Sequence, residues 1–239
     1  MSFRTAACLA AALAAAACGH HPDDAGMVPI FDQVVFGSGN LDTPLGTVYR
    51  WERPVRVAAR GKRKAGSMAG LERVLAEISG AAPLAIALTP TPQDAAADII
   101  VFFEDGEAYL DYLSRRGARV NESRRAAIAA GYCWSITWTV GHEIDEAALF
   151  VGGGGTPAEA AKRLRQCLYH ELAHAVGLAY HPSDAFSILN HESVTARFTR
   201  IDRVLLALLY SGSVSSGMKR ADALRAAAKI LPNLPRPKE

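Results

Sequence analysis

The chain has 239 residues, of which half are hydrophobic and 21% are charged, and its formal net charge at pH 7 is +2. This composition is typical of one soluble globular domain with a short tail. The near-neutral charge argues against a nucleic-acid-binding face and against a polybasic membrane patch, so we expect no nucleic-acid partner.

The first 18 residues are predicted to be a signal peptide rather than part of the fold. Arg4 gives a basic start, and the apolar run at 6–17 is too short to span a bilayer comfortably. Cys18 follows small residues and resembles the cysteine of a bacterial lipoprotein box, although Ala15 stands where leucine is usual. We therefore expect an exported chain, in the periplasm or on the outer membrane as a lipoprotein, whose only membrane contact is a lipid on Cys18. Ordinary signal cleavage nearby is the alternative.

The next segment, residues 19–44, is predicted to be a linker. Gly, Pro, Asp, Ser and Asn recur in it, which is typical of a chain without a core of its own. Two short apolar patches, at 27–31 and 34–36, interrupt this polar composition.

Hydrophobic periodicity predicts strands and helices along the rest of the chain. Alternation around Val55 and Val57 is typical of a strand, whereas apolar residues on one side from Met68 to Ile78 are typical of a helix. The same reasoning predicts strands at 54–59, 84–88, 98–103, 132–139 and 147–151, and helices at 67–78, 105–113, 122–130, 158–175, 199–210 and 219–231. This order predicts an α+β fold in which helices pack on a sheet.

The helix expected at 158–175 has recognisable ends. Residues 156–159 have the pattern of a capping box, with Pro157 at the first helical position. Gly177 falls where the helix should stop, because glycine readily adopts the left-handed conformation of a helix end. A chain reversal there would bring the following residues back towards the last turns of the helix.

These last turns carry His170, Glu171 and His174. Two histidines four residues apart lie on the same face of a helix and can bind one metal ion. Imidazole nitrogens at this spacing suit zinc, and the intervening glutamate suits a general base acting on water. The bare pattern also occurs by chance on the polar face of a helix. The helix ends and a further histidine at His181, just after Gly177, favour the zinc site.

The segment resembles the metzincin branch of the zincin metallopeptidases. That branch has the pattern H-E-x-x-H-x-x-G-x-x-H, followed by a turn that carries methionine. Tyr180 stands at the third-histidine position and Leu189 at the methionine position. The spacing from His181 to Leu189 matches that from the third ligand to the methionine, so we infer one inserted residue after Gly177. The methionine only packs in the family, which makes leucine a mild change.

Further segments resemble an uncharacterised family of secreted bacterial zincin-like proteins, known as domain of unknown function 2927. These segments are 50–57, 167–171, 209–210 and 217–221. The likeness covers residues 45–232 as one whole domain and leaves 233–239 as a tail. Members of that family often lack one or more metal ligands, whereas this sequence keeps both helix histidines.

The resemblance implies a zincin-like fold. Such a fold has a twisted, mixed five-stranded sheet with a backing helix, the metal-binding helix packed on it, and a helical C-terminal part. In zincins the strand before the last pairs with an extended substrate along the cleft, and by position that strand is 132–139. Tyr132, Trp134 and Trp138 would then either line a substrate groove or pack as half-buried strand residues.

The resemblance also implies a function. Zinc would be held by His170, His174 and His181, and Glu171 would be the general base of a metalloendopeptidase in the bacterial cell envelope. Its partner would be a peptide or protein substrate. One competing function is a catalytically silent zincin-like lipoprotein that acts as a binding or scaffold module, and the other is a structural lipoprotein whose histidines bind no metal.

Three nearby residues offer alternatives or additions to this site. Asp184 is the main rival for the third ligand, because some short zincins use aspartate, and Glu192 is a more distant rival. His191 occupies the place of a tyrosine that supports the transition state in astacin-type enzymes. A lone histidine is, however, more often an ordinary surface residue.

Export places the remaining cysteines in an oxidising compartment. Cys8 leaves with the signal peptide and Cys18 would carry lipid, which leaves Cys133 and Cys167 as an even pair. A disulfide between them would join the start of the strand at 132–139 to the metal-binding helix. The alternative, a cysteine ligand of zinc, would have to displace a better-placed histidine.

Overall fold

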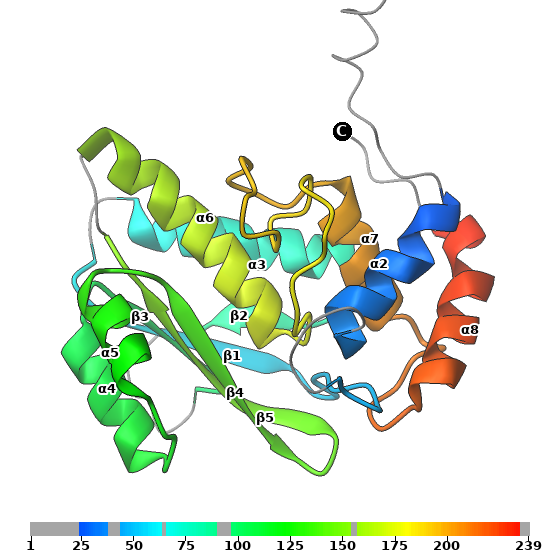
Figure 1. Ribbon diagram of the computed structural model, residues 1–239, viewed down its shortest axis with the longest axis horizontal. Helices are drawn as coiled ribbons and strands as arrows, with labels where there is room; N and C mark the ends of the chain where they lie inside the picture. Colours follow the sequence, from blue (N-terminus) through cyan, green and yellow to red (C-terminus); the bar gives the residue numbers. More distant parts are fainter. Residues whose placement is uncertain (1–23, 38–43, 64–65, 90–96, 154–156, 235–239) are drawn as a thin grey trace, which may run out of the picture.

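The computed structural model describes residues 24–37, 44–63, 66–89, 97–153 and 157–234. Within these ranges the chain is α+β, with one five-stranded sheet and seven α-helices (Figure 1). The strands are β1 (Val55–Gly61), β2 (Ile86–Leu88), β3 (Ile99–Phe103), β4 (Trp134–Val140) and β5 (Glu143–Val151). The helices are α2 (Asp24–Phe36), α3 (Ser67–Ala81), α4 (Gly106–Arg115), α5 (Glu122–Ala129), α6 (Pro157–Ala175), α7 (Arg200–Leu209) and α8 (Arg220–Ile230), followed by the short 3-10 helix η2 (Leu231–Asn233).

The sheet is mixed, as expected, and its strand order is β2-β1-β3-β5-β4. Neighbouring strands from β2 to β5 run parallel, with Val57 beside Ile99 and Ile99 beside Ala147. Strand β4 turns back through a hairpin and pairs antiparallel with β5, so that Trp134 lies opposite Phe150. Among the five strands β4 therefore occupies one edge, and α6 packs beside it.

The central strand β3 is buried on both faces, which is why it is a continuous apolar run in the sequence. Side chains alternate along a strand. Ile99, Val101 and Phe103 therefore face one core, whereas Ile100 and Phe102 face another. The larger core lies under α2, α3, α6, α7 and α8. The smaller core lies under α4 and α5, on the opposite face of the sheet.

The prediction of a linker at 19–44 is wrong for its central part, which forms helix α2. Met27, Phe31 and Val34 are buried in the larger core, and α2 packs against α7 and α8. Apolar residues three and four apart are the mark of a helix with one buried face. Pro29, which lies inside the helix, and the polar neighbours on both sides obscured that periodicity.

Strand β5 is also longer than expected, beginning at Glu143 rather than at residue 147. Its first half alternates Glu143 and Asp145 with the buried Ile144, so only its second half is an apolar run. The capping residue Thr156 and the tail from residue 235 lie outside the described residues. No α-helix within the described residues has the length and apolar character needed to cross a membrane.

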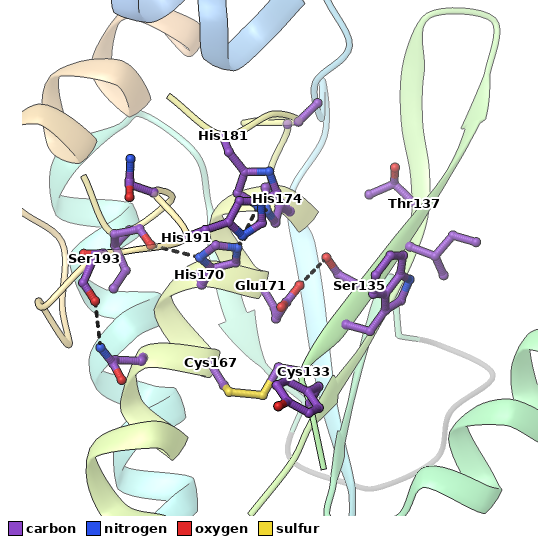
Figure 2. Close-up of a pocket in the computed structure, with 18 of the residues that line it drawn as sticks. Cys133, Ser135, Thr137, Cys167, His170, Glu171, His174, His181, His191 and Ser193 are labelled. Carbon is purple, nitrogen blue, oxygen red and sulfur yellow. Dashed lines mark hydrogen bonds between the residues drawn. A yellow bond between two sulfur atoms is a disulfide. The ribbon is translucent and has the colours of Figure 1, made fainter. Parts of the chain in front are cut away.

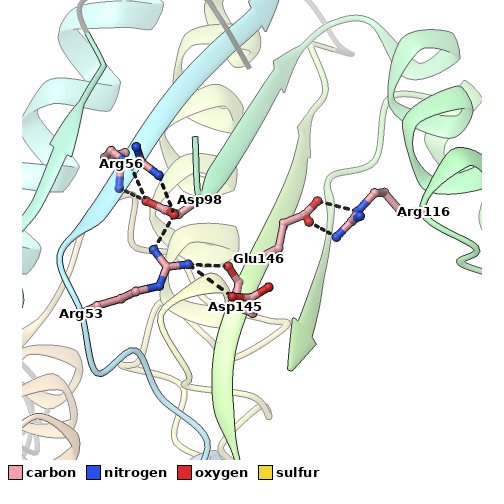
Figure 3. A network of polar contacts seen from close by, with 6 residues as sticks. All are labelled: Arg53, Arg56, Asp98, Arg116, Asp145 and Glu146. Atoms are coloured by element: carbon pink, nitrogen blue, oxygen red, sulfur yellow. Dashed lines mark hydrogen bonds and ion pairs between the residues drawn. The ribbon is translucent and has the colours of Figure 1, made fainter. Parts of the chain in front are cut away.

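A polar network joins the approach to β1, the start of β3 and the first half of β5 (Figure 3). Asp98, which precedes β3 and is 5% exposed, accepts hydrogen bonds from Arg53 and from the backbone and side chain of Arg56. Burial opposes its ionisation, but the hydrogen bonds from Arg56 and Arg53 outweigh burial and lower the pKa of Asp98. Arg53 also donates to the carbonyl of Asp145, 2.9 Å away, and so ties the approach to β1 to strand β5.

We expect the Phe31→Ala substitution to lower the free energy of unfolding by about 3–5 kcal/mol, because it removes a fully buried ring from α2. Urea denaturation measures this loss. The control is Glu72→Ala on the exposed side of α3, which should change stability by no more than about 0.5 kcal/mol. Equal stabilities of the two variants would contradict the assignment of α2 to the core.

Candidate metal centre

Three histidines converge at the C-terminal end of α6 (Figure 2). The Nε2 atoms of His170 and His174 are 3.1 Å apart, those of His170 and His181 are 3.1 Å apart, and those of His174 and His181 are 3.2 Å apart. The ligand atoms of these three residues can hold one metal ion. The structure thus brings together all three residues that the sequence suggested as ligands.

Hydrogen bonds at the opposite nitrogens orient two of the rings. His170 Nδ1 lies 2.9 Å from the carbonyl oxygen of Ile188, and His174 Nδ1 lies 2.6 Å from that of Leu178. A carbonyl oxygen only accepts, so each Nδ1 must be the protonated nitrogen, and each Nε2 of a neutral ring carries a lone pair. Metal-binding histidines are typically oriented in this way by a second partner.

Burial keeps these rings neutral. It lowers the pKa of His170, and together with the neighbouring imidazoles it lowers the pKa of His174. The pKa of His181 is lowered to about 3, mainly by burial and further by the charges that His170 and His191 would carry. Three lone pairs facing one another at about 3 Å repel unless a cation lies between them. The donor set therefore fits a divalent metal ion better than it fits three unliganded histidines.

The end of α6 explains how His181 reaches the other two histidines. Gly177 has φ = +102°, its N–H donates to the carbonyl of His174, and Leu178 N–H donates to the carbonyl of Ala173. This pair of bonds is the Schellman arrangement that ends a helix and reverses the chain. A Cβ atom at Gly177 would come within 2.7 Å of the carbonyl oxygen of Tyr49, so the position requires glycine.

Helix α2 supports the returning segment from outside. Tyr180 N–H donates to the carbonyl of Val34 at 2.9 Å, and Ser183 donates through both its N–H and its hydroxyl to the side chain of Gln33. These bonds flank His181 on both sides. The ring of Tyr180, the residue expected to be a ligand if no residue is inserted after Gly177, packs against Gly37 at the end of α2.

A buried carboxylate holds the turn that supports His170. Asp202, which is fully buried near the start of α7, accepts hydrogen bonds from the Ser187 hydroxyl and from the N–H of Ile188. It also accepts bonds from the N–H and hydroxyl of Thr199. The Ile188 carbonyl is thereby fixed where His170 donates to it. Leu189, at the position of the metzincin methionine, is fully buried in the same turn.

Glu171 lies beside the three histidines but points towards strand β4. The residue is 7% exposed, and its carboxylate accepts a 2.6 Å hydrogen bond from the hydroxyl of Ser135. Burial raises the pKa of Glu171 to about 7, and the bond from Ser135 partly opposes this shift. A carboxylate with a pKa near neutrality can both take up and release a proton at physiological pH.

A cavity of about 860 Å³ opens above this cluster, between α6 and β4. Ser135, Thr137 and Thr139 lie along its β4 wall. Of the three aromatic residues considered for a groove, Tyr132 and Trp134 border the cavity. Trp138 does not border the cavity. Like Trp134, it packs against the smaller core on the other face of the sheet, and it contacts Tyr112 and Arg116.

Of the other candidate residues, His191 lies beside the histidine cluster, whereas Asp184 and Glu192 do not belong to it. The ring of His191 stacks on that of His181, with centroids 3.8 Å apart, and it lines the cavity. Asp184 is not part of the histidine cluster, and its carboxylate accepts a bond from the N–H of Phe186. Glu192 is likewise outside that cluster. Cys18 lies outside the described residues.

The predicted disulfide between Cys133 and Cys167 is confirmed, with a Cα–Cα distance of 5.8 Å. Cys167 lies on α6 one turn before His170, and Cys133 immediately precedes β4. Both cysteines also line the cavity, so the bond fixes the distance between its two walls at one end.

Sequence reasoning missed two residues that hold the site. Ser135 alternates with Trp134 and Ile136 along β4, so strand periodicity alone places it on the opposite face, towards α6. Asp202 lies in the first turn of α7, where Thr199 and Asp202 form a capping box that marks the start of the helix. Its second role depends on the tertiary position of the turn at Ser187, which no local pattern indicates.

We expect a variant with both Cys133→Ser and Cys167→Ser to lose about 4 kcal/mol of stability, because the bond closes a loop between residues 34 apart. Urea denaturation of the oxidised proteins measures the difference. Reduced wild-type protein should unfold at the same urea concentration as the variant. A variant as stable as the oxidised wild type would show that the bond does not constrain the fold.

We expect His181→Ala to weaken zinc binding by at least about a hundredfold, whereas Asp184→Ala changes it by less than about threefold. Of these two residues, only His181 places a ligand atom beside those of His170 and His174. Competition with a chromophoric chelator measures both affinities. A larger loss for Asp184→Ala would make Asp184 the third ligand.

Comparison with known proteins places the chain in a family. A search of curated proteins finds no match. A family model described as "Protein of unknown function (DUF2927)" matches residues 25–229, which is most of the chain. That match includes α2 from its second residue onward as well as the complete histidine cluster. The chain therefore belongs to the DUF2927 family of proteins of unknown function.

Proposed function

We propose that this protein is a zinc-dependent metalloendopeptidase with a zincin-like fold. One observation carries the proposal: three imidazole Nε2 atoms converge within 3.2 Å beside a buried glutamate, at the floor of a cavity. The edge strand beside that cavity supports the same conclusion, because an extended peptide can pair with a free strand edge.

The spacing of the nitrogens supports zinc as the metal. Tetrahedral zinc with Zn–N bonds of about 2.0–2.1 Å requires its ligand nitrogens to lie about 3.3 Å apart. The observed separations of 3.1 to 3.2 Å are close to this value. Three neutral nitrogens also leave a fourth position of the tetrahedron open, which is the pattern of catalytic rather than structural zinc sites.

Bound zinc would supply a Lewis acid that activates water at neutral pH and polarises a carbonyl group. The chain's own contribution begins with Glu171, whose carboxylate takes a proton from the attacking water and returns it to the leaving amine. Ser135 holds that carboxylate at a fixed angle through its 2.6 Å hydrogen bond. Burial of Glu171 excludes bulk water from the same position.

Strand β4 would position the substrate. It forms one edge of the five-stranded sheet and borders the cavity along its length. A peptide pairing with it in extended conformation would pass over the histidine cluster, with alternate side chains directed into the cavity. His191, stacked over His181 at the rim, would contact such a peptide near the reacting carbonyl.

The cellular setting is part of the proposal. The lipoprotein-like cysteine at position 18 would anchor the protein in the cell envelope after export, either in the periplasm or on the outer membrane. The disulfide between Cys133 and Cys167 is consistent with an oxidising compartment of this kind.

We expect Glu171→Gln to abolish peptide hydrolysis, with a loss of at least about 10³-fold in kcat/KM, while zinc stays bound. Cleavage of a peptide library, followed by mass spectrometry, measures the loss, and elemental analysis measures the zinc. The matched control, Glu72→Gln on α3, should keep full activity. Undiminished hydrolysis by Glu171→Gln would exclude Glu171 as the base, and zinc binding without hydrolysis by the wild type would favour the silent binding module.

A further inference from the structure

The cavity extends from the histidines towards the N-terminal part of α6, and its charge changes along the way. Arg163, Cys167, His170 and His174 are spaced four, three and four residues apart, so they share one face of the helix. All four line the cavity. With a rise of about 1.5 Å per residue, Arg163 lies about 10 Å along the helix from His170.

A second arginine reaches the same end from the opposite wall. Arg124, in the first turn of α5, places its guanidinium 4.5 Å from the ring centre of Trp134 at the start of β4. Arg124 also lines the cavity. Among the described residues neither Arg124 nor Arg163 forms an ion pair with a carboxylate of the chain. Both arginines therefore border the cavity, and neither is paired with a carboxylate of its walls.

Two neighbouring polar side chains of the lining already have hydrogen-bond partners within the chain. The amide nitrogen of Gln166 donates to the carbonyls of Ser193 and Thr195, at 3.3 and 2.8 Å. Asn190 donates to the carbonyl of Pro182 and accepts from the backbone beyond it. Glu171 is the single carboxylate residue in the described lining, and Ser135 holds it at the histidine cluster.

The opposite end of the cavity has no such charge. Its lining there comes from Leu45, Tyr49, Ile144 and Ala179, which are apolar or neutral. A peptide lying along β4 therefore meets positive charge on only one side of the reacting bond. Arginine binds carboxylates through paired, charge-assisted hydrogen bonds, so this end suits an acidic side chain.

We propose that the cleft selects peptides with an aspartate or glutamate within the first three residues after the scissile bond, bound by Arg163 and Arg124. This inference rests on the proposed function. Antiparallel addition to β4 is the more stable mode of strand pairing, and it directs the residues after the bond towards the start of β4. At about 3.3 Å per residue, three residues span the 10 Å between His170 and Arg163.

Peptide binding tests this inference without requiring hydrolysis. The probes are two hexapeptide libraries that differ only in Glu or Gln at one fixed position, equilibrated with Zn²⁺-loaded protein carrying Glu171→Gln. Mass spectrometry of the retained peptides should show about tenfold more Glu than Gln members. Equal retention of the two libraries would overturn the inference.

Arginine variants in the same background locate the preference. Arg163→Gln combined with Arg124→Gln should reduce the Glu-to-Gln ratio to about one. Arg163→Glu alone, which reverses the charge at that position, should also lower the ratio. The matched control is Arg165→Gln, which removes an exposed α6 charge outside the cavity lining and should leave the ratio unchanged. A preference that survives the double substitution, or disappears in the control, would overturn the assignment to these two residues.

Cleavage by the wild-type protein then tests the direction. Acidic residues should be enriched within three positions after the cleaved bonds, and enrichment only before the bond would overturn that part of the inference. The two proposals fail separately. Acid-selective binding without any hydrolysis would refute the metalloendopeptidase, whereas hydrolysis without acid preference would refute only the selectivity.

Discussion

The hydrogen bonds from His170 and His174 to two backbone carbonyls are the constraint on which the site depends. Each bond selects the tautomer in which Nδ1 carries the proton and donates it, and so directs the Nε2 lone pair towards the same point. The carbonyl of Leu178 belongs to the turn that ends α6, and that of Ile188 belongs to the turn held by Asp202. The direction of the metal-facing lone pairs is thus set by backbone that the rest of the fold holds in place.

Each wall of the site is fixed by a different part of the chain. Helix α2 supports the segment that carries His181, the buried Asp202 holds the turn behind His170, and the disulfide joins the start of β4 to α6. These supports come from residues that are far apart in the sequence. Both metal binding and catalysis are favoured by such a preorganised site, because no free energy is then spent on rearranging the ligands.

The local parts of this arrangement could be predicted from the sequence. His170, Glu171 and His174 follow from helix spacing, Gly177 from the chemistry of helix ends, and the disulfide from the cysteine count. Three features could not be predicted in this way. Pro29 and its polar surroundings concealed helix α2, which tertiary packing stabilises. The hydroxyl of Ser135 contacts Glu171 only because β4 lies at the edge of the sheet beside α6. Asp202 contacts the turn at Ser187 and Ile188 only in the folded chain, because the two segments are separated in the sequence.

Anomalous X-ray diffraction at the zinc absorption edge would show whether the three histidines bind one zinc ion. The crystals should come from protein purified without a histidine tag. We expect a single strong peak about 2.0–2.1 Å from the Nε2 atoms of His170, His174 and His181. Crystals grown with excess Zn²⁺ that show no peak between these rings, or a peak bound elsewhere, would contradict this expectation.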